Sequence, residues 1–193
     1  MKLYFVRHTE YYNPAHLYAF HLPFHLTEYG RKQALMIGDW FLKKEVGMLP
    51  IIASPIVRTV QTAELIASKT HAMVTIDRRI IESACPELQG KVHASEKHWI
   101  EEEDNRTRET QKSLLARMTS ICDEVVSSGK DTILISHGDP LTVLYYYLIQ
   151  EDPPRYFWDP QNAAKVIGRG EIIEVTLENG SVRSVDRHPL SEV

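Results

Sequence analysis

The chain has 193 residues, of which 43% are hydrophobic and 25% charged, a composition typical of a soluble globular protein. Its two cysteines, Cys85 and Cys122, form neither a disulfide framework nor a metal-type C-x-x-C pair. The formal net charge of −4 argues against a nucleic-acid binder that depends on bulk positive charge. No stretch approaches the roughly 20 apolar residues of a membrane span, and the apolar run after Lys2 stops at Arg7, too early for a secretory signal, so we predict a cytoplasmic protein with no membrane partner.

The first predicted element is a short buried strand at residues 3–6, an apolar run of residue types that favour strands. It stops at Arg7 and His8, two polar residues at the carboxyl end of a buried strand, where open α/β sheets place their ligands. An imidazole beside a guanidinium is a candidate nucleophile or base next to an anion-binding group. Because such a pair also occurs by chance, its interpretation depends on partners later in the chain.

Residues 11–25 form a predicted loop that is rich in aromatic residues and histidines and shows no regular period. His21 and His25 have the i,i+4 spacing of a metal pair, but Pro23 lies between them and disfavours a regular helix. Histidines on the surface or in a pocket wall are the alternative, and we predict no metal site.

A helix is expected from Thr27, which can cap it, towards Gly47, with Ala34 and Phe41 among the residues that face the core. A second short buried strand follows at residues 51–53.

Ser54 and Pro55 are predicted to start the next helix, as N-cap and first helical residue. Arg58 would lie in its first turn, off the apolar stripe, and there it can form an anion site; a surface arginine is the alternative.

A third strand is predicted at residues 74–76, and Glu82 follows soon after it. Glu82 is either a surface carboxylate or part of the site. The irregular, polar residues 83–108 are interpreted as a lid-like excursion over one end of the sheet. A clear amphipathic helix around residues 114–126 ends at Gly129.

The fourth strand, residues 132–135, repeats the pattern of the first, because it ends at Ser136 and His137. Gly138 permits close backbone approach before a helix predicted at residues 141–149. Near the end of the chain, residues 171–177 and 181–185 flank a hairpin turn centred on Asn179 and Gly180.

Alternating strands and helices predict one α/β domain over residues 1–193, a three-layer αβα sandwich with a mainly parallel central sheet. In such a sheet, the strand ends at Arg7-His8, Ser54 and His137 can converge on one edge. Two guanidinium groups there would favour an anionic substrate, most naturally a phosphoryl group. A histidine could then attack phosphorus while a carboxyl group protonates the leaving oxygen.

The sequence resembles the histidine phosphatase superfamily (phosphoglycerate mutase-like). The resemblance rests on five segments in the family's order: Val6-Arg7-His8-Thr9-Glu10, Leu26-Thr27-Glu28-Tyr29-Gly30, the ten residues from Ser54 to Ala63, Arg79-Ile80-Ile81-Glu82 and Ser136-His137-Gly138. Thr9 stands where the family more often has glycine, a variant that it tolerates.

The resemblance implies a role for each matching residue. His8 would be the nucleophile that becomes phosphohistidine, and Glu82 the general acid, with Glu87 as a second acidic candidate that fits the pattern less well. Arg7, Arg58 and His137 would hold the phosphoryl oxygens. Asn13, one residue short of the asparagine that often contacts phosphate in the family, and Gly138 complete the candidate substrate-binding residues. The resemblance implies no cofactor and no metal.

Three functions are compatible with this pattern. The first is a phosphatase acting on a phosphomonoester of a small molecule or a protein. The second is a mutase that returns the phosphoryl group to its substrate, but the mutases that the chain resembles are longer, with insertions and a C-terminal tail that shield phosphohistidine from water. The third is a non-catalytic phosphate-binding module. We expect the phosphatase, since the histidines, arginines and glutamate are all present.

Overall fold

A six-stranded sheet with the strand order β3-β2-β4-β1-β5-β6 forms the centre of the computed structural model, which describes residues 1–44, 46, 48–92, 107–157 and 159–193. The four strands from β3 to β1 in this order are parallel, whereas β5 is antiparallel to β1 and β6 to β5. The strands are β1 (Lys2–Arg7), β2 (Ile51–Ala53), β3 (Val74–Ile76), β4 (Thr132–Ser136), β5 (Ile172–Glu178) and β6 (Ser181–His188).

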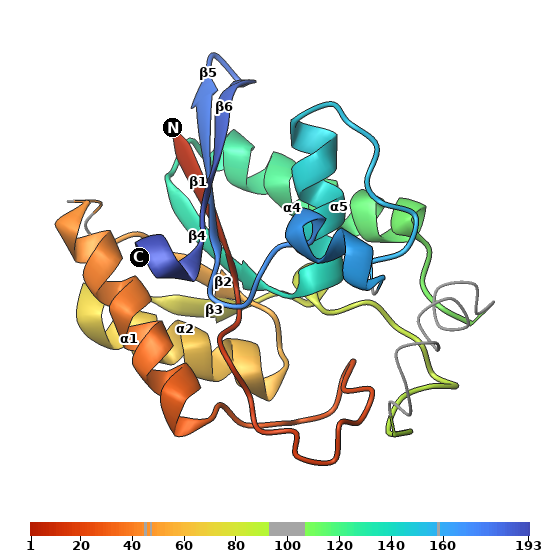
Figure 1. Cartoon of the computed structure of the whole chain (residues 1–193). Coiled ribbons are helices and arrows are strands. Elements are labelled where there is room, and N and C mark those ends of the chain that lie inside the picture. The colour runs from red at the N-terminus through yellow and green to blue at the C-terminus, as the bar shows by residue number, and fades with distance from the viewer. Residues whose placement is uncertain (45, 47, 93–106, 158) are drawn as a thin grey trace.

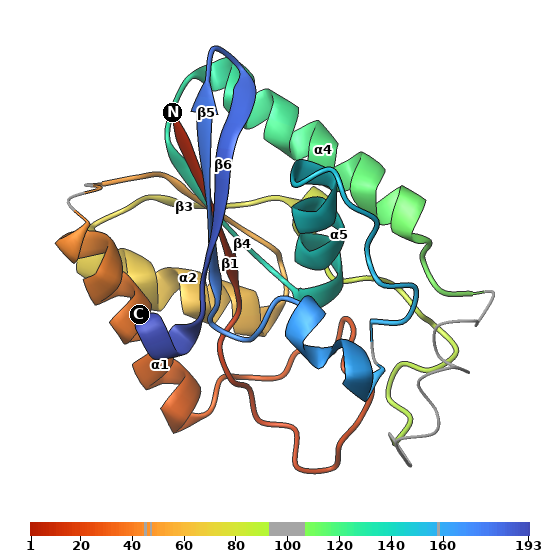
Figure 2. The ribbon, with the colours of Figure 1, turned by 45° about the horizontal axis from the view of Figure 1, so that its top comes forward.

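The sheet lies between two pairs of helices, with α1 and α2 on one face and α4 and α5 on the other (Figures 1 and 2). The helices of the described residues are α1 (Glu28–Lys43), α2 (Val57–Thr70), α4 (Gln111–Ser128) and α5 (Gly138–Leu148), with short 3-10 turns η1 (Arg78–Ile80), η3 (Pro160–Lys165) and η4 (Leu190–Glu192). The α/β fold with a mainly parallel sheet, predicted from the sequence, is confirmed.

The side chains of β1 alternate between the two layers of the core. Leu3 and Phe5 pack in the cluster beneath α4 and α5, and Tyr4 and Val6 pack in the cluster beneath α1 and α2. Since successive strand residues point to opposite faces, an uninterrupted apolar run is what a strand covered on both faces requires. Each of these four side chains is buried.

The parallel register brings several chain segments to one edge of the sheet. Arg7 pairs with Ser136, and the His8 N–H donates to the Ser136 carbonyl oxygen at 3.0 Å. Ser54 follows β2, and its N–H donates to the carbonyl oxygen of Ile135 at 3.0 Å. Because β5 runs antiparallel to β1, the residues that precede β5 also lie at this edge.

Two predicted helix starts differ from the structure. α2 begins at Val57, with Ile56 rather than Ser54 as its N-cap. α5 begins at Gly138, earlier than expected, and includes Pro140 in its first turn, where proline's missing N–H removes no helical hydrogen bond.

Other local predictions are confirmed. Thr27 caps α1, since its hydroxyl accepts from the Gly30 N–H, and Gly129 ends α4 in the left-handed conformation. The turn between β5 and β6 has positive φ at Asn179 and Gly180, as a two-residue hairpin turn requires.

Most of the predicted lid-like excursion at 83–108 falls on residues 93–106, which lie outside the described residues, so the lid stays a prediction. Within the described ranges, no helix combines the length and the apolar character that a membrane crossing needs.

Candidate active site

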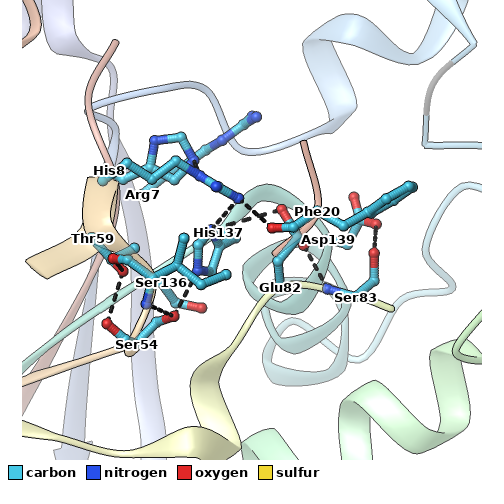
Figure 3. A network of polar contacts seen from close by, with 12 residues as sticks. Arg7, His8, Phe20, Ser54, Thr59, Glu82, Ser83, Ser136, His137 and Asp139 are labelled. Carbon is cyan, nitrogen blue, oxygen red and sulfur yellow. Dashed lines mark hydrogen bonds and ion pairs between the residues drawn. The ribbon is translucent and has the colours of Figure 1, made fainter. Parts of the chain in front are cut away.

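The edge formed by the carboxyl ends of β1, β2 and β4 gathers the predicted site residues. In Figure 3, the side chains of Arg7, His8, Glu82 and His137 form one cluster. The ring centroids of His8 and His137 are 5.2 Å apart, and His137 Nδ1 lies 3.9 Å from Glu82 Oε2. Arg58, from the first turn of α2, hydrogen-bonds to both histidines.

His8 is buried, and its hydrogen bonds define which nitrogen carries the proton. Nδ1 lies 2.8 Å from the Thr9 carbonyl oxygen, which can only accept, so Nδ1–H is the donor. Nε2 accepts from Arg58 Nε–H at 3.1 Å and therefore holds a lone pair. Burial, together with Arg58 and Arg7, holds the pKa of His8 well below its usual value. His8 is thus a neutral imidazole with its Nε2 lone pair towards the cations.

Arg58 is anchored by neutral carbonyl groups. Its Nη1 and Nη2 groups donate to the backbone oxygens of Ala19, Phe20 and Leu22, at 3.4, 2.8 and 3.3 Å. A further N–H on Nη2 is 3.2 Å from His137 Nδ1. The predicted loop at residues 11–25 therefore orients the guanidinium without neutralising its charge.

His137 is the N-cap residue of α5 and is completely buried. Because its Nδ1 accepts from Arg58, its proton is on Nε2, which donates to Ser54 Oγ at 2.8 Å. Burial and the charge of Arg58 hold the pKa of His137 well below its usual value. Ser54 does not cap α2 as predicted: its hydroxyl oxygen accepts from the imidazole and, at 3.5 Å, from the Ile56 N–H, while Ile56 is the N-cap residue.

Arg7 fits against the N-terminus of α5 only because residue 138 is a glycine. A Cβ at Gly138 would lie 2.9 Å from Arg7 Cζ, closer than such atoms can approach. Arg7 Nη1 donates to the Ile167 carbonyl oxygen at 2.6 Å. Its buried Nε–H has no hydrogen-bond partner within the described part of the chain, which is uncommon for a buried donor and leaves it available to an anion.

Glu82 is the acidic group of the cluster, and its pKa is raised, whereas the pKa values of His8 and His137 are lowered. Its side chain is buried, and burial followed by the nearby charge of Asp139 raises its pKa to about 7. The Ser83 N–H donates to Glu82 Oε1 at 2.9 Å, and the Ser83 hydroxyl donates to Asp139 Oδ2 at 2.6 Å. Asp139 is also paired with Arg108. A carboxyl group with this pKa holds a proton near neutral pH and can deliver it.

A cavity of about 310 Å³ opens over this cluster. Its walls come from the site residues, from the loop after β1 and from the turn before β5: Arg7, His8, Tyr11, Asn13, His16, Leu17, Tyr18, Ala19, Phe20, Arg58, Glu82 and Arg169. The floor of the cavity is therefore buried and cationic and contains His8, the candidate nucleophile. The wall of the cavity is partly aromatic.

A model described as the histidine phosphatase superfamily (branch 1) matches residues 3–183. The chain belongs to this superfamily.

The chain is similar to relatives that are named for two activities, phosphatase and mutase. It is 30% identical to the putative phosphoserine phosphatase 2 of Hydrogenobacter thermophilus over 153 residues, 72% of this chain and 74% of the relative. It is 28% identical to the probable phosphoglycerate mutase GpmB of Erwinia tasmaniensis over 158 residues, 75% and 73% of the two chains. A mycobacterial glucosyl-3-phosphoglycerate phosphatase, solved with VO3, has the same fold, with a TM-score of 0.75, 23% identity and 96% coverage of both chains.

Two of the residues predicted for the site lie apart from the central cluster. Asn13 lines the cavity, but its side-chain amide is bonded at both ends to the backbone of Leu17, at 2.8 and 3.0 Å. Glu87 is exposed and does not line the cavity, whereas Glu82 does. The histidines of the loop also have separate places: His21 bonds to the Glu82 carbonyl oxygen, His25 to the Gln61 side chain, and His16 lines the cavity.

Sequence reasoning missed three polar residues of the site: Ser54 as a partner of His137, Asp139 as a neighbour of Glu82, and Arg169 in the cavity wall. Ser54 had a partial sequence signal, because it ends the second predicted strand and was expected at the converging edge. Arg169 had none, because the predicted hairpin does not fix the direction of its first strand relative to β1.

The first prediction concerns anion binding. We expect orthovanadate or inorganic phosphate to bind between Arg7, His8, Arg58 and His137, because Arg7 and Arg58 bring positive charge and donors to the cavity beside the two histidines. At about 100 times its Kd, an anion stabilises the protein by about 2.7 kcal/mol, or roughly 5–10 °C in Tm for a chain of this size. Arg58→Ala should lose this shift, measured against its own Tm, whereas Arg183→Ala, at an exposed arginine of β6, should keep it. Equal shifts in both variants would contradict the site.

Proposed function

We propose that this protein is a phosphoric monoester hydrolase that works without a metal through a phosphohistidine on His8. The observation that carries the proposal is the buried, neutral imidazole of His8, whose Nε2 lone pair faces Arg58 in the same cavity as a protonated Glu82. A neutral nucleophile, an anion holder and a proton donor are the three components that transfer from a phosphomonoester requires.

In the first step, the phosphoryl oxygens accept hydrogen bonds from Arg7 and Arg58, and from His137 once its Nδ1 has taken a proton from solvent. The Arg58 Nε–H group breaks its hydrogen bond to His8 Nε2 and donates to a phosphoryl oxygen instead. This frees the lone pair on Nε2. Nε2 then attacks phosphorus and forms an N–P bond, while the bond from phosphorus to the leaving oxygen breaks. Glu82 gives its proton to that oxygen, so the alcohol leaves neutral and Glu82 becomes a carboxylate.

In the second step, the Glu82 carboxylate takes a proton from water as the water oxygen attacks phosphorus. The N–P bond breaks, its electron pair returns to His8 Nε2, and inorganic phosphate leaves. Glu82 is protonated again, as at the start. One carboxyl group can serve as acid and then as base, as it does in retaining glycosidases.

Positive side chains can supply the charge that phosphoryl transfer usually draws from a metal ion. Arg7 and Arg58 lie at the floor of the cavity, and both are held by neutral carbonyl oxygens, so their charges stay available to a phosphoryl group. An incoming dianion also raises the pKa of His137, which favours protonation of Nδ1 and a third donor.

Relatives support a phosphatase and also name the alternative. The Hydrogenobacter relative and the mycobacterial structure are named as phosphatases, and the Erwinia relative as a probable mutase. The two activities share the first step and differ in the acceptor of the second, which is water or an alcohol. Release of inorganic phosphate, rather than an isomerised phosphoester, separates them.

The second prediction tests the nucleophile. His8→Ala should abolish turnover and leave the fold intact, because alanine removes Nε2 but fits the space. Wild type quenched during turnover of a radiolabelled phosphomonoester should carry acid-labile, base-stable label on His8. His71→Asn, at an exposed histidine with positive φ, is the matched control and should keep both label and turnover. Sustained activity of His8→Ala, or loss of activity with a chelator, would refute the mechanism.

The third prediction tests Glu82 through the leaving group. An alkyl phosphate leaves as a strongly basic alkoxide and needs the proton, whereas nitrophenyl phosphate leaves as a stabilised phenolate. Glu82→Gln should slow phosphoryl transfer from an alkyl phosphate by about 10²–10⁴-fold, the usual range for general acid catalysis. The same substitution should slow the initial burst of nitrophenol from nitrophenyl phosphate much less. Rapid mixing isolates this first step. Glu87→Gln, an exposed alternative, should alter neither. An equally damaged burst would mean that Glu82 is not the acid.

The fourth prediction is a pH dependence. Glu82 donates its proton only below its pKa, which is about 7 in the free protein and rises when a phosphoryl dianion binds beside it. The first-step rate at saturating alkyl phosphate should therefore fall as pH rises through this raised pKa, at a pH above 7. His8, with its lowered pKa, stays neutral down to well below pH 6.5. The decrease of the first-step rate at high pH should be absent in Glu82→Gln. If it persists in that variant, another group donates the proton.

A further inference from the structure

The segment that carries Glu82 has no regular secondary structure. It follows the 3-10 turn η1, and residues 81–85 belong to no helix or strand. One end of the Glu82 side chain is held by Ser83, whose N–H donates to Oε1 at 2.9 Å. The position of the carboxyl group in the cavity therefore also depends on what holds the Glu82 backbone.

Among the residues that the structure describes, two side chains donate hydrogen bonds to the Glu82 carbonyl oxygen. His21 Nε2 lies 2.9 Å from this oxygen, which can only accept, so Nε2 carries a proton. Arg117 Nη2 donates to it from α4 at 3.3 Å. Arg117 is bonded more closely to the Arg79 carbonyl oxygen, at 2.6 Å, and is ion-paired with Glu109. His21 thus makes the shorter of the two contacts to Glu82.

His21 belongs to the same part of the loop that orients Arg58. Backbone carbonyl oxygens on both sides of His21 accept from the guanidinium: those of Ala19, Phe20 and Leu22. The His21 N–H is itself bonded to Gln89 Oε1 at 3.0 Å. Residues 19–22 therefore hold the cation through their backbone and the acid through one imidazole.

We propose that His21 is a positioning residue for Glu82: its imidazole holds the general acid at a fixed place relative to Arg58, and so to the phosphoryl group. The proposal rests on the proposed phosphatase function, in which Glu82 must meet the leaving oxygen while Arg58 holds phosphoryl oxygens. Proton transfer requires the acid to be within hydrogen-bond reach of that oxygen, and a displacement of about 1 Å can slow a reaction by about 10²-fold.

The two kinds of contact made by this loop can be separated by a substitution. Loss of the imidazole removes a donor to Glu82, whereas Arg58 keeps its backbone acceptors. A change at His21 should therefore disturb the step that needs the acid, and it should spare anion binding and attack by His8. A side chain that only filled space would not make this distinction.

The fifth prediction tests His21 with two kinds of leaving group. His21→Leu should slow the release of glycerol from glycerol 2-phosphate, an alkyl phosphate, by about 10- to 100-fold in a single turnover. The nitrophenol burst and the Tm shift with orthovanadate should stay close to wild type, because they depend on His8 and Arg58. His21→Gln, which keeps an N–H group for the Glu82 carbonyl oxygen, should restore part of the rate. His25→Leu, at an exposed histidine of the same loop, is the matched control and should keep the full rate.

A double-mutant cycle shows whether the effect of His21 passes through Glu82. In the Glu82→Gln background, His21→Leu should slow alkyl phosphate transfer little further, because the effects of residues that act as one unit do not add. A full additional loss in that background would refute the role of His21. An equal loss with nitrophenyl phosphate would refute it too, since the loop would then act through the fold or through Arg58.

The outcomes separate this inference from the phosphatase proposal. If Glu82→Gln shows the expected dependence on the leaving group but His21→Leu keeps the wild-type rate with glycerol 2-phosphate, the role of His21 is refuted and the phosphatase proposal stands. If wild type hydrolyses neither phosphomonoester, the function itself is wrong. If His21→Leu unfolds or loses the orthovanadate shift, His21→Gln decides, and a folded His21→Gln without any selective loss or recovery of alkyl phosphate transfer would overturn the inference.

Discussion

The hydrogen bond from His8 Nδ1–H to the Thr9 carbonyl oxygen is the interaction on which the candidate site depends. A proton held on Nδ1 leaves Nε2 as an acceptor, and Arg58 can then approach it to 3.1 Å. If the proton were on Nε2, two N–H donors would face each other in a buried space, which costs free energy. The backbone directly after β1 thus sets the tautomer of His8 and the direction of its lone pair.

A second constraint is that the arginines must be held in place without being neutralised. Carboxylates would orient Arg7 and Arg58 but would also cancel the charge that a phosphoryl group needs. Backbone carbonyl oxygens orient both instead, from the loop at residues 19–22 and from Ile167. Asp139 is occupied by Ser83 and Arg108, which limits its influence on the cations. The proposed anion would therefore relieve the unfavourable proximity of these like charges.

Sequence reasoning predicted the parts of this structure that follow local rules. The apolar runs predicted the strands, and the repeated ending in a histidine, at His8 and His137, indicated the edge where ligands bind. Contacts between distant segments could not be predicted in the same way. Ser54 satisfies the local rule for a helix cap, yet its hydroxyl bonds to a residue 83 positions away. Arg169 reaches the cavity because β5 is antiparallel, which no local pattern around it requires.

Burial is the largest cause of the opposed pKa shifts of His8, the candidate nucleophile, and Glu82, the candidate acid. Removal from water disfavours whichever form is charged, so it lowers the pKa of His8 and raises that of Glu82. Both groups become neutral, one with a free lone pair and the other with a proton to donate. The neighbouring charges reinforce the difference, since Arg58 acts first on His8 and Asp139 first on Glu82. Such opposed shifts are how paired groups acquire distinct roles in an active site. These pKa shifts depend on how deeply each group is buried and on neighbouring residues from five chain segments. The residue types in a motif therefore indicate the chemistry, but only the folded structure determines which groups carry a proton.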